Sequence, residues 1–199
     1  YTVGIALQTI KLVFEWLEKS VKTADPEARE KMHNASTMAG MAFANAFLGM
    51  SHSMAHKIGG VHHTVHGRTN AILLPYVIRY NGTRPSKTTT WPKYNYWKAD
   101  EKFQDIAKML GLPHSTPEEA VEAYAKAVYE LGVAVGIKMN FKDQGIDEKA
   151  WKDSLHEIAL LAYEDQCSPA NPRLPMVADM EEIMADAYYG YAERPGRRK

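Results

Sequence analysis

The chain has 199 residues, 45% of them hydrophobic, and its 24 basic side chains balance 24 acidic ones, so the formal net charge is zero. This composition is typical of a soluble globular protein, and the balanced charge argues against nucleic-acid binding and membrane-surface recognition, which both need a cationic face. The single cysteine, Cys167, cannot form an internal disulfide and indicates a cytoplasmic protein.

Helical periodicity recurs from end to end, whereas alternating strand patterns are hard to find, and we therefore predict an all-α fold. The first helix has one continuous apolar face, formed by Val3, Ala6, Ile10, Val13, Phe14 and Leu17. Asp25-Pro26 ends this helix and begins the next, because Asp25 is a good N-cap and Pro26 is tolerated at the first helical position.

A long uncharged segment follows, with no Lys, Arg, Asp or Glu from His33 to His56. Its length would suit a membrane span, but its many Asn, Ser, Thr and His side chains make that interpretation poor. We predict instead a central helix that is buried on all sides. Gly59-Gly60 is expected to break the helical pattern, and a further apolar helix is predicted from about His66 to Tyr80.

Residues 81 to 97 are polar, contain prolines and carry several aromatic side chains, which is typical of a long surface loop. Its aromatic part, Trp91 to Trp97, is either a subunit contact or an ordinary surface loop. The segment from Cys167 to Pro175 is expected to be irregular. Further helices are predicted near 100–110, after a capping box at Thr116-Pro117-Glu118-Glu119, at 147–165 and at 176–188.

These patterns predict one all-α bundle of seven or eight helices over residues 1–190, followed by a disordered tail at 191–199. There is no repeat at a fixed period and no second composition regime. The chain begins at Tyr1, without Met and without a signal peptide, and runs straight into a helix. We therefore expect it to be cut from a longer protein.

Five of the eight histidines fall within fifteen residues, at positions 52, 56, 62, 63 and 66. His52 and His56 are four residues apart, so their rings share one helical face with the Cβ atoms about 6 Å apart. Imidazole suits Fe(II), Zn(II), Ni(II) and Cu(II). A helical pair of this kind is often only a packed, hydrogen-bonded pair, and the pattern alone leaves both interpretations open. No H-E-x-x-H, structural-zinc cysteine spacing or G-x-G-x-x-G motif is present.

In this context the sequence resembles a known family. The stretch 39–49 (AGMAFANAFLG), with His52-Ser53-Met54-Ala55-His56-Lys57 and His66-Gly67, is similar to the C-terminal helical domain of iron-containing (group III) alcohol dehydrogenases. Residues 70–74 with 77–81, residues 165–167 with 170–173, and residues 187–190 resemble most the alcohol dehydrogenase half of bifunctional aldehyde-alcohol dehydrogenases. The resemblance implies the multi-helix bundle of the dehydroquinate synthase-like superfamily.

The resemblance also implies a role for individual residues. His52 and His66 would be metal ligands. His56 would be the catalytic proton relay beside the reacting oxygen and the nicotinamide, which suits a group that titrates near neutral pH. Phe43 would approach the nicotinamide ring, so that Phe43 and His56 would both contact the cofactor.

The resemblance also bears on His62 and His63, and the sequence departs from the family pattern on both sides of His66-Gly67. His63 would line the site, whereas His62 matches no family role and is expected to face solvent. Relatives commonly have Pro where Val65 precedes His66, and a small apolar pair where Arg68-Thr69 follows Gly67. The loss of a fixed φ at position 65 would loosen that ligand.

The implied reaction is NAD(H)-dependent interconversion of a primary alcohol and an aldehyde at Fe(II), with Zn(II) as the alternative metal. The metal would act as a Lewis acid on the substrate oxygen. The family's other two ligands, an Asp and a His four residues apart, and its α/β nucleotide-binding domain precede the region where this chain begins. We therefore expect a chain that is inactive by itself, acts on a small alcohol or aldehyde only with the missing domain, and forms homo-oligomers.

Two other interpretations remain open at this stage. The chain could be an independent helical metal-binding or interaction module without chemistry, which would complete its metal shell with His62 and His63. It could also belong to a polyol dehydrogenase of the same superfamily, although Asn171-Pro172-Arg173 fits the alcohol dehydrogenases better.

Overall fold

The computed structural model describes residues 1–85 and 97–190. The predicted tail at 191–199 and most of the predicted loop, including Trp91, lie outside the described residues. Within the described part, the chain forms eight α-helices, one short 3₁₀ helix and no strand, as the sequence predicts. The elements are α1 (Thr2–Thr23), α2 (Pro26–Ala46), α3 (Met50–His62), α4 (His66–Gly82), α5 (Ala99–Met109), α6 (Pro117–Ala134), α7 (Glu148–Tyr163), η2 (Ser168–Ala170) and α8 (Val177–Tyr189).

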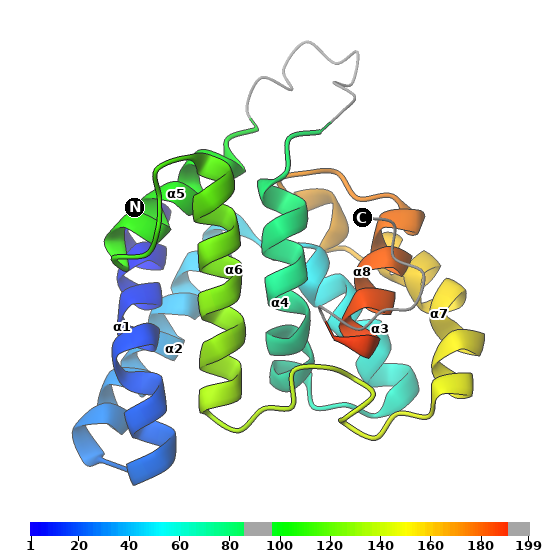
Figure 1. Cartoon of the computed structure of the whole chain (residues 1–199), viewed down its shortest axis with the longest axis horizontal. Coiled ribbons are helices and arrows are strands. Elements are labelled where there is room, and N and C mark those ends of the chain that lie inside the picture. The colour runs from blue at the N-terminus through cyan, green and yellow to red at the C-terminus, as the bar shows by residue number, and fades with distance from the viewer. Residues whose placement is uncertain (86–96, 191–199) are drawn as a thin grey trace.

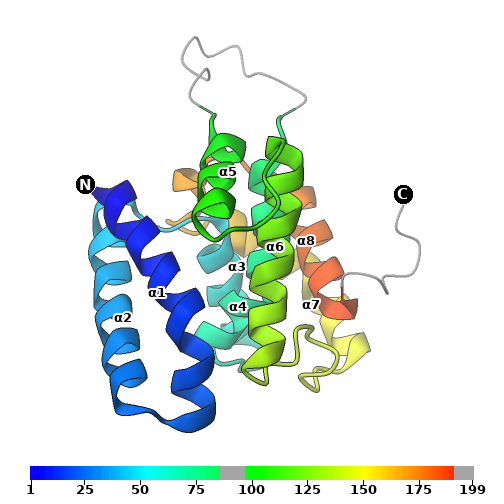
Figure 2. The same ribbon diagram turned by 60° about the vertical axis from the view of Figure 1, so that its left-hand side comes forward.

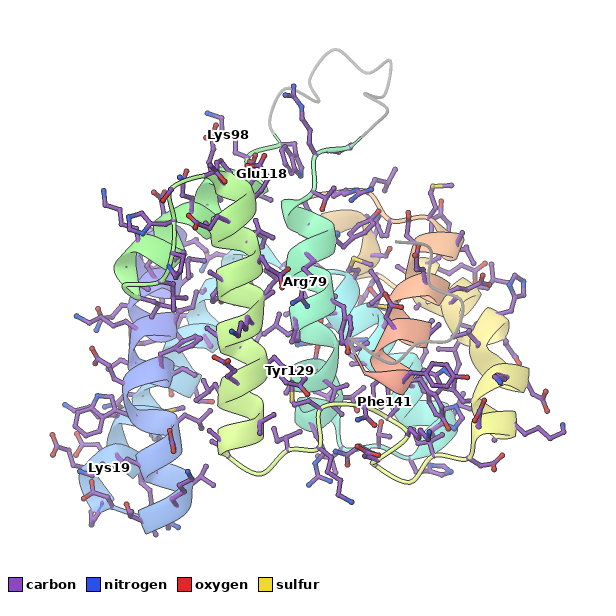
Figure 3. All side chains as sticks on the ribbon, viewed as in Figure 1. Lys19, Arg79, Lys98, Glu118, Tyr129 and Phe141 are labelled. Carbon is purple, nitrogen blue, oxygen red and sulfur yellow. The ribbon has the colours of Figure 1, made fainter. Side chains whose placement is uncertain are left out.

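Helices α4 and α6 lie side by side in the middle of the molecule (Figure 1). The α1–α2 hairpin lies on one side of this pair, and α3, α7 and α8 lie on the other. After rotation, the hairpin comes forward and α5 is seen against α6 (Figure 2). Arg79 of α4 reaches toward α6 (Figure 3), where its guanidinium forms two hydrogen bonds of 2.6 and 2.7 Å with Glu122.

Two apolar clusters hold these helices together, and α4 contributes to both. The larger one joins α3, α4, α7 and α8 around Leu73 and Trp151, which are 0% and 2% exposed. The smaller one joins Ile78 of α4 to Tyr124 of α6, with partly buried side chains of α1 packed against it. Helix α4 is therefore fixed from both sides, which gives its N-terminal His66 a rigid base.

The predicted helix starts are confirmed by their caps. Asp25 accepts a hydrogen bond from the Ala28 N–H, and Thr116 accepts one from the Glu119 N–H, at 2.9 and 3.2 Å. The capping box is shifted by one residue, because Glu119 accepts from the N–H of Ser115 and not from that of Thr116. Asp147 caps α7 in the same way as Asp25 caps α2.

The prediction of one buried helix through residues 33–56 is wrong. Helix α2 ends at Ala46, Phe47 takes φ 64° and ψ −177°, and a new helix begins at Met50. Helix α2 is buried on one side only, where Ala28, Ala35 and Ala42 lie against α1, whereas Met41 and Phe43 are about half exposed. None of the described helices combines the length and the apolar character needed to cross a membrane.

Two smaller predictions also need correction. Gly59-Gly60 does not break the helix, since both glycines lie inside α3, which ends at His62 before His63 in the left-handed region (φ 54°). A Cβ on Gly59 would lie 3.4 Å from the Thr64 carbonyl oxygen, so glycine here lets the chain turn back closely over its own helix. The irregular segment after Cys167 contains the 3₁₀ turn η2.

The two-cluster core predicts how stability responds to truncation. Leu73→Ala should lower the free energy of unfolding by about 2–5 kcal/mol, because it leaves a cavity at a fully buried position of α4. The matched control is Leu161→Ala on α7, where the side chain is 40% exposed and the loss should stay below about 1 kcal/mol. Urea unfolding followed by circular dichroism measures both, and equal losses would contradict this view of the core.

Candidate metal and proton-transfer site

Three of the predicted histidines come together between α3 and the start of α4. The ring centroids of His52 and His66 are 5.3 Å apart, and so are those of His56 and His66. His52 and His56 follow one another on α3, with centroids 6.1 Å apart. The sequence spacing accounts for the pair on α3, and the turn at residues 63–65 returns His66 to the same place.

His56 is oriented by a carboxylate from a distant part of the chain. Its Nδ1 lies 3.2 Å from Oδ2 of Asp165, which follows α7, and the ammonium of Lys57 lies 2.9 Å from the same oxygen. The other oxygen of Asp165 accepts the N–H of Cys167 at 3.0 Å. Because an ionised carboxylate can only accept hydrogen bonds, Nδ1 of His56 carries a hydrogen, and in the neutral ring the lone pair is on Nε2.

The electrostatics of this group follow from burial and partners. Burial raises the pKa of Asp165, but the hydrogen bonds from Lys57, the Cys167 N–H and His56 outweigh it and hold that pKa well below its usual range. Burial lowers the pKa of His52, and the neighbouring imidazoles of His66 and His56 lower it further. His52 is therefore favoured in the neutral form, which is the form that ligates a metal.

His66 is held by its own helix and by α3. The Asn70 side-chain amide lies 3.3 Å from Nε2 of His66 and donates to the His66 carbonyl at 3.2 Å. The amide oxygen of Asn70 accepts a hydrogen bond of 2.9 Å from the Ser51 hydroxyl. Through Asn70, the first turn of α4 is tied to the residue that precedes His52.

The spacing of His52 and His66 fits two ligands of one metal ion. Nitrogen–metal bonds of about 2.1 Å at a near-tetrahedral angle place two imidazole centres about 5 Å apart, and the observed separation is 5.3 Å. Imidazole nitrogen suits Fe(II) and Zn(II) alike. Two imidazoles supply half of a four-ligand shell, so further ligands would have to come from outside this pair.

A second group of ligand-type atoms does not fit a metal as well. Atoms of His56, Asp165 and Cys167 lie within 4.8 Å of one another, which is the one group of this kind in the described part of the chain. However, the Lys57 ammonium already neutralises the carboxylate, and burial and the neighbouring Asp165 raise the pKa of the Cys167 thiol. The Asp165 carboxylate is therefore paired with His56 and Lys57. A metal ion bound here would be repelled by the Lys57 ammonium.

The remaining predicted residues lie elsewhere. His63 lines a cavity of about 300 Å³ together with His62 and Arg68, and this lining contains none of the three clustered histidines. His62 does not face solvent as predicted, because it stacks on Trp151 with centroids 5.3 Å apart and bonds the Ser154 hydroxyl at 3.0 Å. This placement does not favour a shell completed by His62 and His63. Phe43 lies on the outer part of α2 and is 46% exposed.

Sequence reasoning missed the residues that orient the histidines. Asp165 stands 109 positions from His56, and Asn70 was noted only as part of a similar stretch. The one available signal was indirect: no Asp or Glu occurs between His33 and Ala99, so any carboxylate partner had to come from a distant segment.

Comparison with known proteins identifies related chains. Residues 1–188 match the model of the Fe-containing alcohol dehydrogenase family, C-terminal. The chain is 79% identical over 199 residues to an aldehyde-alcohol dehydrogenase of Streptococcus pneumoniae serotype 2 (strain D39 / NCTC 7466), covering all of this chain and 22% of that protein. It is 39% identical to the bifunctional aldehyde-alcohol dehydrogenase of Escherichia coli (strain K12), covering 94% and 22%.

A solved structure gives the same result at the level of the fold. A 1,3-propanediol oxidoreductase superposes with a TM-score of 0.79 and 34% identity, over 94% of this chain and 45% of that one. The chain thus spans about a fifth of the length of the curated relatives and less than half of this structural relative.

The buried carboxylate predicts a pH-dependent loss of stability on substitution. The folded-state pKa of Asp165 is depressed, so its contribution is complete above the unfolded-state value of about 3.9 and is lost as the pH falls below it. Asp165→Asn should therefore be less stable than the unaltered chain by about 1–3 kcal/mol at pH 7, and the difference should shrink toward pH 3. Urea unfolding at a series of pH values measures it. A pH-independent difference would show that the charge of Asp165 is not the cause.

Proposed function

The chain belongs to the iron-containing alcohol dehydrogenase family, of which it carries the C-terminal part, and we propose that it supplies two metal ligands and one wall of the active site for NAD(H)-dependent interconversion of a primary alcohol and an aldehyde. The observation that carries this proposal is the meeting of His52 and His66 at a ring separation of 5.3 Å, which is compatible with one shared metal ion, beside an oriented His56. Residues 1–190 act in this proposal as one all-α unit that works together with a nucleotide-binding domain.

The family name supports iron, and we propose Fe(II) held by the imidazoles of His52 and His66, with Zn(II) as the alternative. Such an ion would polarise the oxygen of the bound substrate and lower the pKa of an alcohol. Burial and the neighbouring imidazoles lower the pKa of His52, which favours the neutral, ligating imidazole. Asn70 lies against the His66 ring and accepts a hydrogen bond from Ser51 of α3, so it ties the starts of the two helices together.

His56 is the proposed proton relay. Its Nδ1–H is committed to Asp165, so Nε2 is the atom that accepts a proton from the alcohol or returns one to the aldehyde. Asp165 stays ionised throughout because its pKa is depressed, and it stabilises the imidazolium when His56 carries the extra proton. NAD(H) would carry the hydride, and the exposed ring of Phe43 is the proposed contact to the nicotinamide.

The partners in this proposal are a small alcohol or aldehyde, the nucleotide-binding domain and a second copy of the protein. Exposed apolar side chains on α7, among them Leu160 and Leu161, support a protein contact on that side. The one cysteine, Cys167, is free and buried, which supports a cytoplasmic location.

The metal-binding part of the proposal is tested directly with Co(II), a spectroscopic substitute for Fe(II). Titration of the 199-residue chain should broaden the ring-proton NMR signals of His52 and His66, and His52→Ala should weaken binding at least about tenfold. His114→Ala is the matched control, since that histidine follows α5 and its ring bonds to a nearby backbone carbonyl. Equal binding by both variants would place the metal somewhere other than at the three clustered histidines.

The catalytic part is tested in a whole protein. The chain alone, with Fe(II), NAD⁺ and ethanol, should form no NADH, because half of the metal shell and the cofactor domain are absent from it. Exchanged for the corresponding segment of the 79%-identical Streptococcus pneumoniae relative, it should support NADH formation, and His52→Ala in that chimera should reduce the rate at least about 100-fold. NADH formation by the isolated chain would refute the two-part site.

A further inference from the structure

The side chain of Asn171 connects the two helices that carry the clustered histidines. Its oxygen accepts hydrogen bonds from the Met50 N–H at the start of α3 (3.2 Å) and from the Asn81 amide near the end of α4 (3.4 Å). Its nitrogen donates to the Asn81 oxygen at 2.7 Å and to the Arg173 carbonyl at 2.6 Å. Asn171 is 8% exposed and Asn81 is 6% exposed, so these bonds form away from water, where each is costly to lose.

Helix α3 depends on this contact because it has no cap of its own. Its N-cap is Gly49, which has no side chain to accept the free N–H groups of the first turn. Asn171 supplies the missing acceptor for the N–H of Met50, although the two residues are 121 positions apart in the sequence. Met50 lies two residues before His52. A helix start held in this way has a fixed direction relative to α4.

The absence of a side chain at Gly49 leaves the space that the Asn171 side chain occupies. A Cβ on Gly49 would lie 2.7 Å from the Asn171 oxygen, which is closer than non-bonded atoms approach. The φ of Gly49 is −120°, which any residue adopts, so the requirement for glycine here comes from space and not from backbone conformation. On the other side, the guanidinium of Arg173 donates to the Tyr80 and Thr83 carbonyls at 3.0 and 3.3 Å and fixes the segment to the end of α4.

We infer that Asn171 is a positioning residue for the proposed metal site: it anchors the first turn of α3 to the end of α4, so that His52 faces His66 at ligand separation before a metal arrives. Asp165 contacts the same helix one turn beyond His52, at His56 and Lys57. The segment from Asp165 to Asn171 thus holds α3 at both ends of the stretch that bears the histidines. This inference rests on the proposed function, because it concerns ligands that the proposal assigns.

The test compares variants of the 199-residue chain by Co(II) titration, with broadening of the His52 and His66 ring signals as the readout and far-UV circular dichroism as the check of folding. Asn171→Ala should raise the Co(II) concentration needed for half-broadening about tenfold. Gly49→Ala should have a similar effect, because its methyl group displaces the Asn171 side chain. The double variant should be no worse than Asn171→Ala alone, since the methyl group then meets only the Cα of residue 171, at an ordinary van der Waals distance of 3.7 Å. The control is Asn140→Ala, which removes two side-chain hydrogen bonds of similar length in the loop before α7.

The outcomes separate this inference from the proposal beneath it. No broadening in the unaltered chain would overturn the metal site and the inference with it. Equal Co(II) binding by the unaltered chain and by folded Asn171→Ala would overturn the inference alone, and so would strictly additive losses in the double variant. If Asn171→Ala does not fold, Gly49→Ala against Asn140→Ala decides in the same way: a selective loss supports the inference, and equal binding overturns it.

Discussion

Helix α3 has to be buried along one side and open along the other, and the arrangement of the site depends on this constraint. Met50, Met54 and Ile58 follow one another at four-residue spacing and are fully buried in the larger core. His52 follows Met50 by two residues, and His56 follows Met54 by two. Each histidine therefore lies about 200° around the helix axis from the buried residue before it. The core that fixes the backbone of α3 therefore cannot fix the two imidazoles, which lie on the opposite side.

The polar partners of the imidazoles supply what the core cannot. Asp165 holds the ring of His56 and Asn70 holds that of His66, and the Asn171 amide sets the start of the helix. Asp165 and Asn70 contact the histidines directly. Asn70 lies on α4, which belongs to the larger core, and Asp165 follows α7, which also belongs to that core. Packing thus determines ligand geometry indirectly, by placing the groups that orient the rings.

Local signals allowed much of the fold to be predicted, and long-range contacts account for what could not be. Asp25, Thr116 and Asp147 mark helix starts because their side chains bond to N–H groups only three residues away. The i, i+4 pair His52 and His56 was readable for the same reason. Asp165 and Asn171 carry no comparable mark, since a carboxylate or an amide has the same local pattern whether it meets water or a helix more than 100 residues distant. The resemblance to a family indicated the segments that contain them, and only the packed chain shows what they contact.

The break that the sequence did not reveal is also the one that makes the site possible. Phe47 adopts φ 64° and ψ −177°, a region used almost only by glycine, at a cost of about 1–3 kcal/mol. The residues at this position do not mark it, because Ala46, Phe47 and Leu48 are all acceptable in a helix. Had α2 continued through Phe47, residues 48–56 would have extended along its axis beyond the start of α1, and His52 could not have reached His66. The turn is held on one side by the Phe47 N–H bond to the Phe43 carbonyl (2.8 Å) and on the other by the burial of Met50. The strained backbone of Phe47 therefore accompanies the change of direction that takes the chain from the α1–α2 hairpin into the core. There α3 and α4, which carry His52 and His66, lie together.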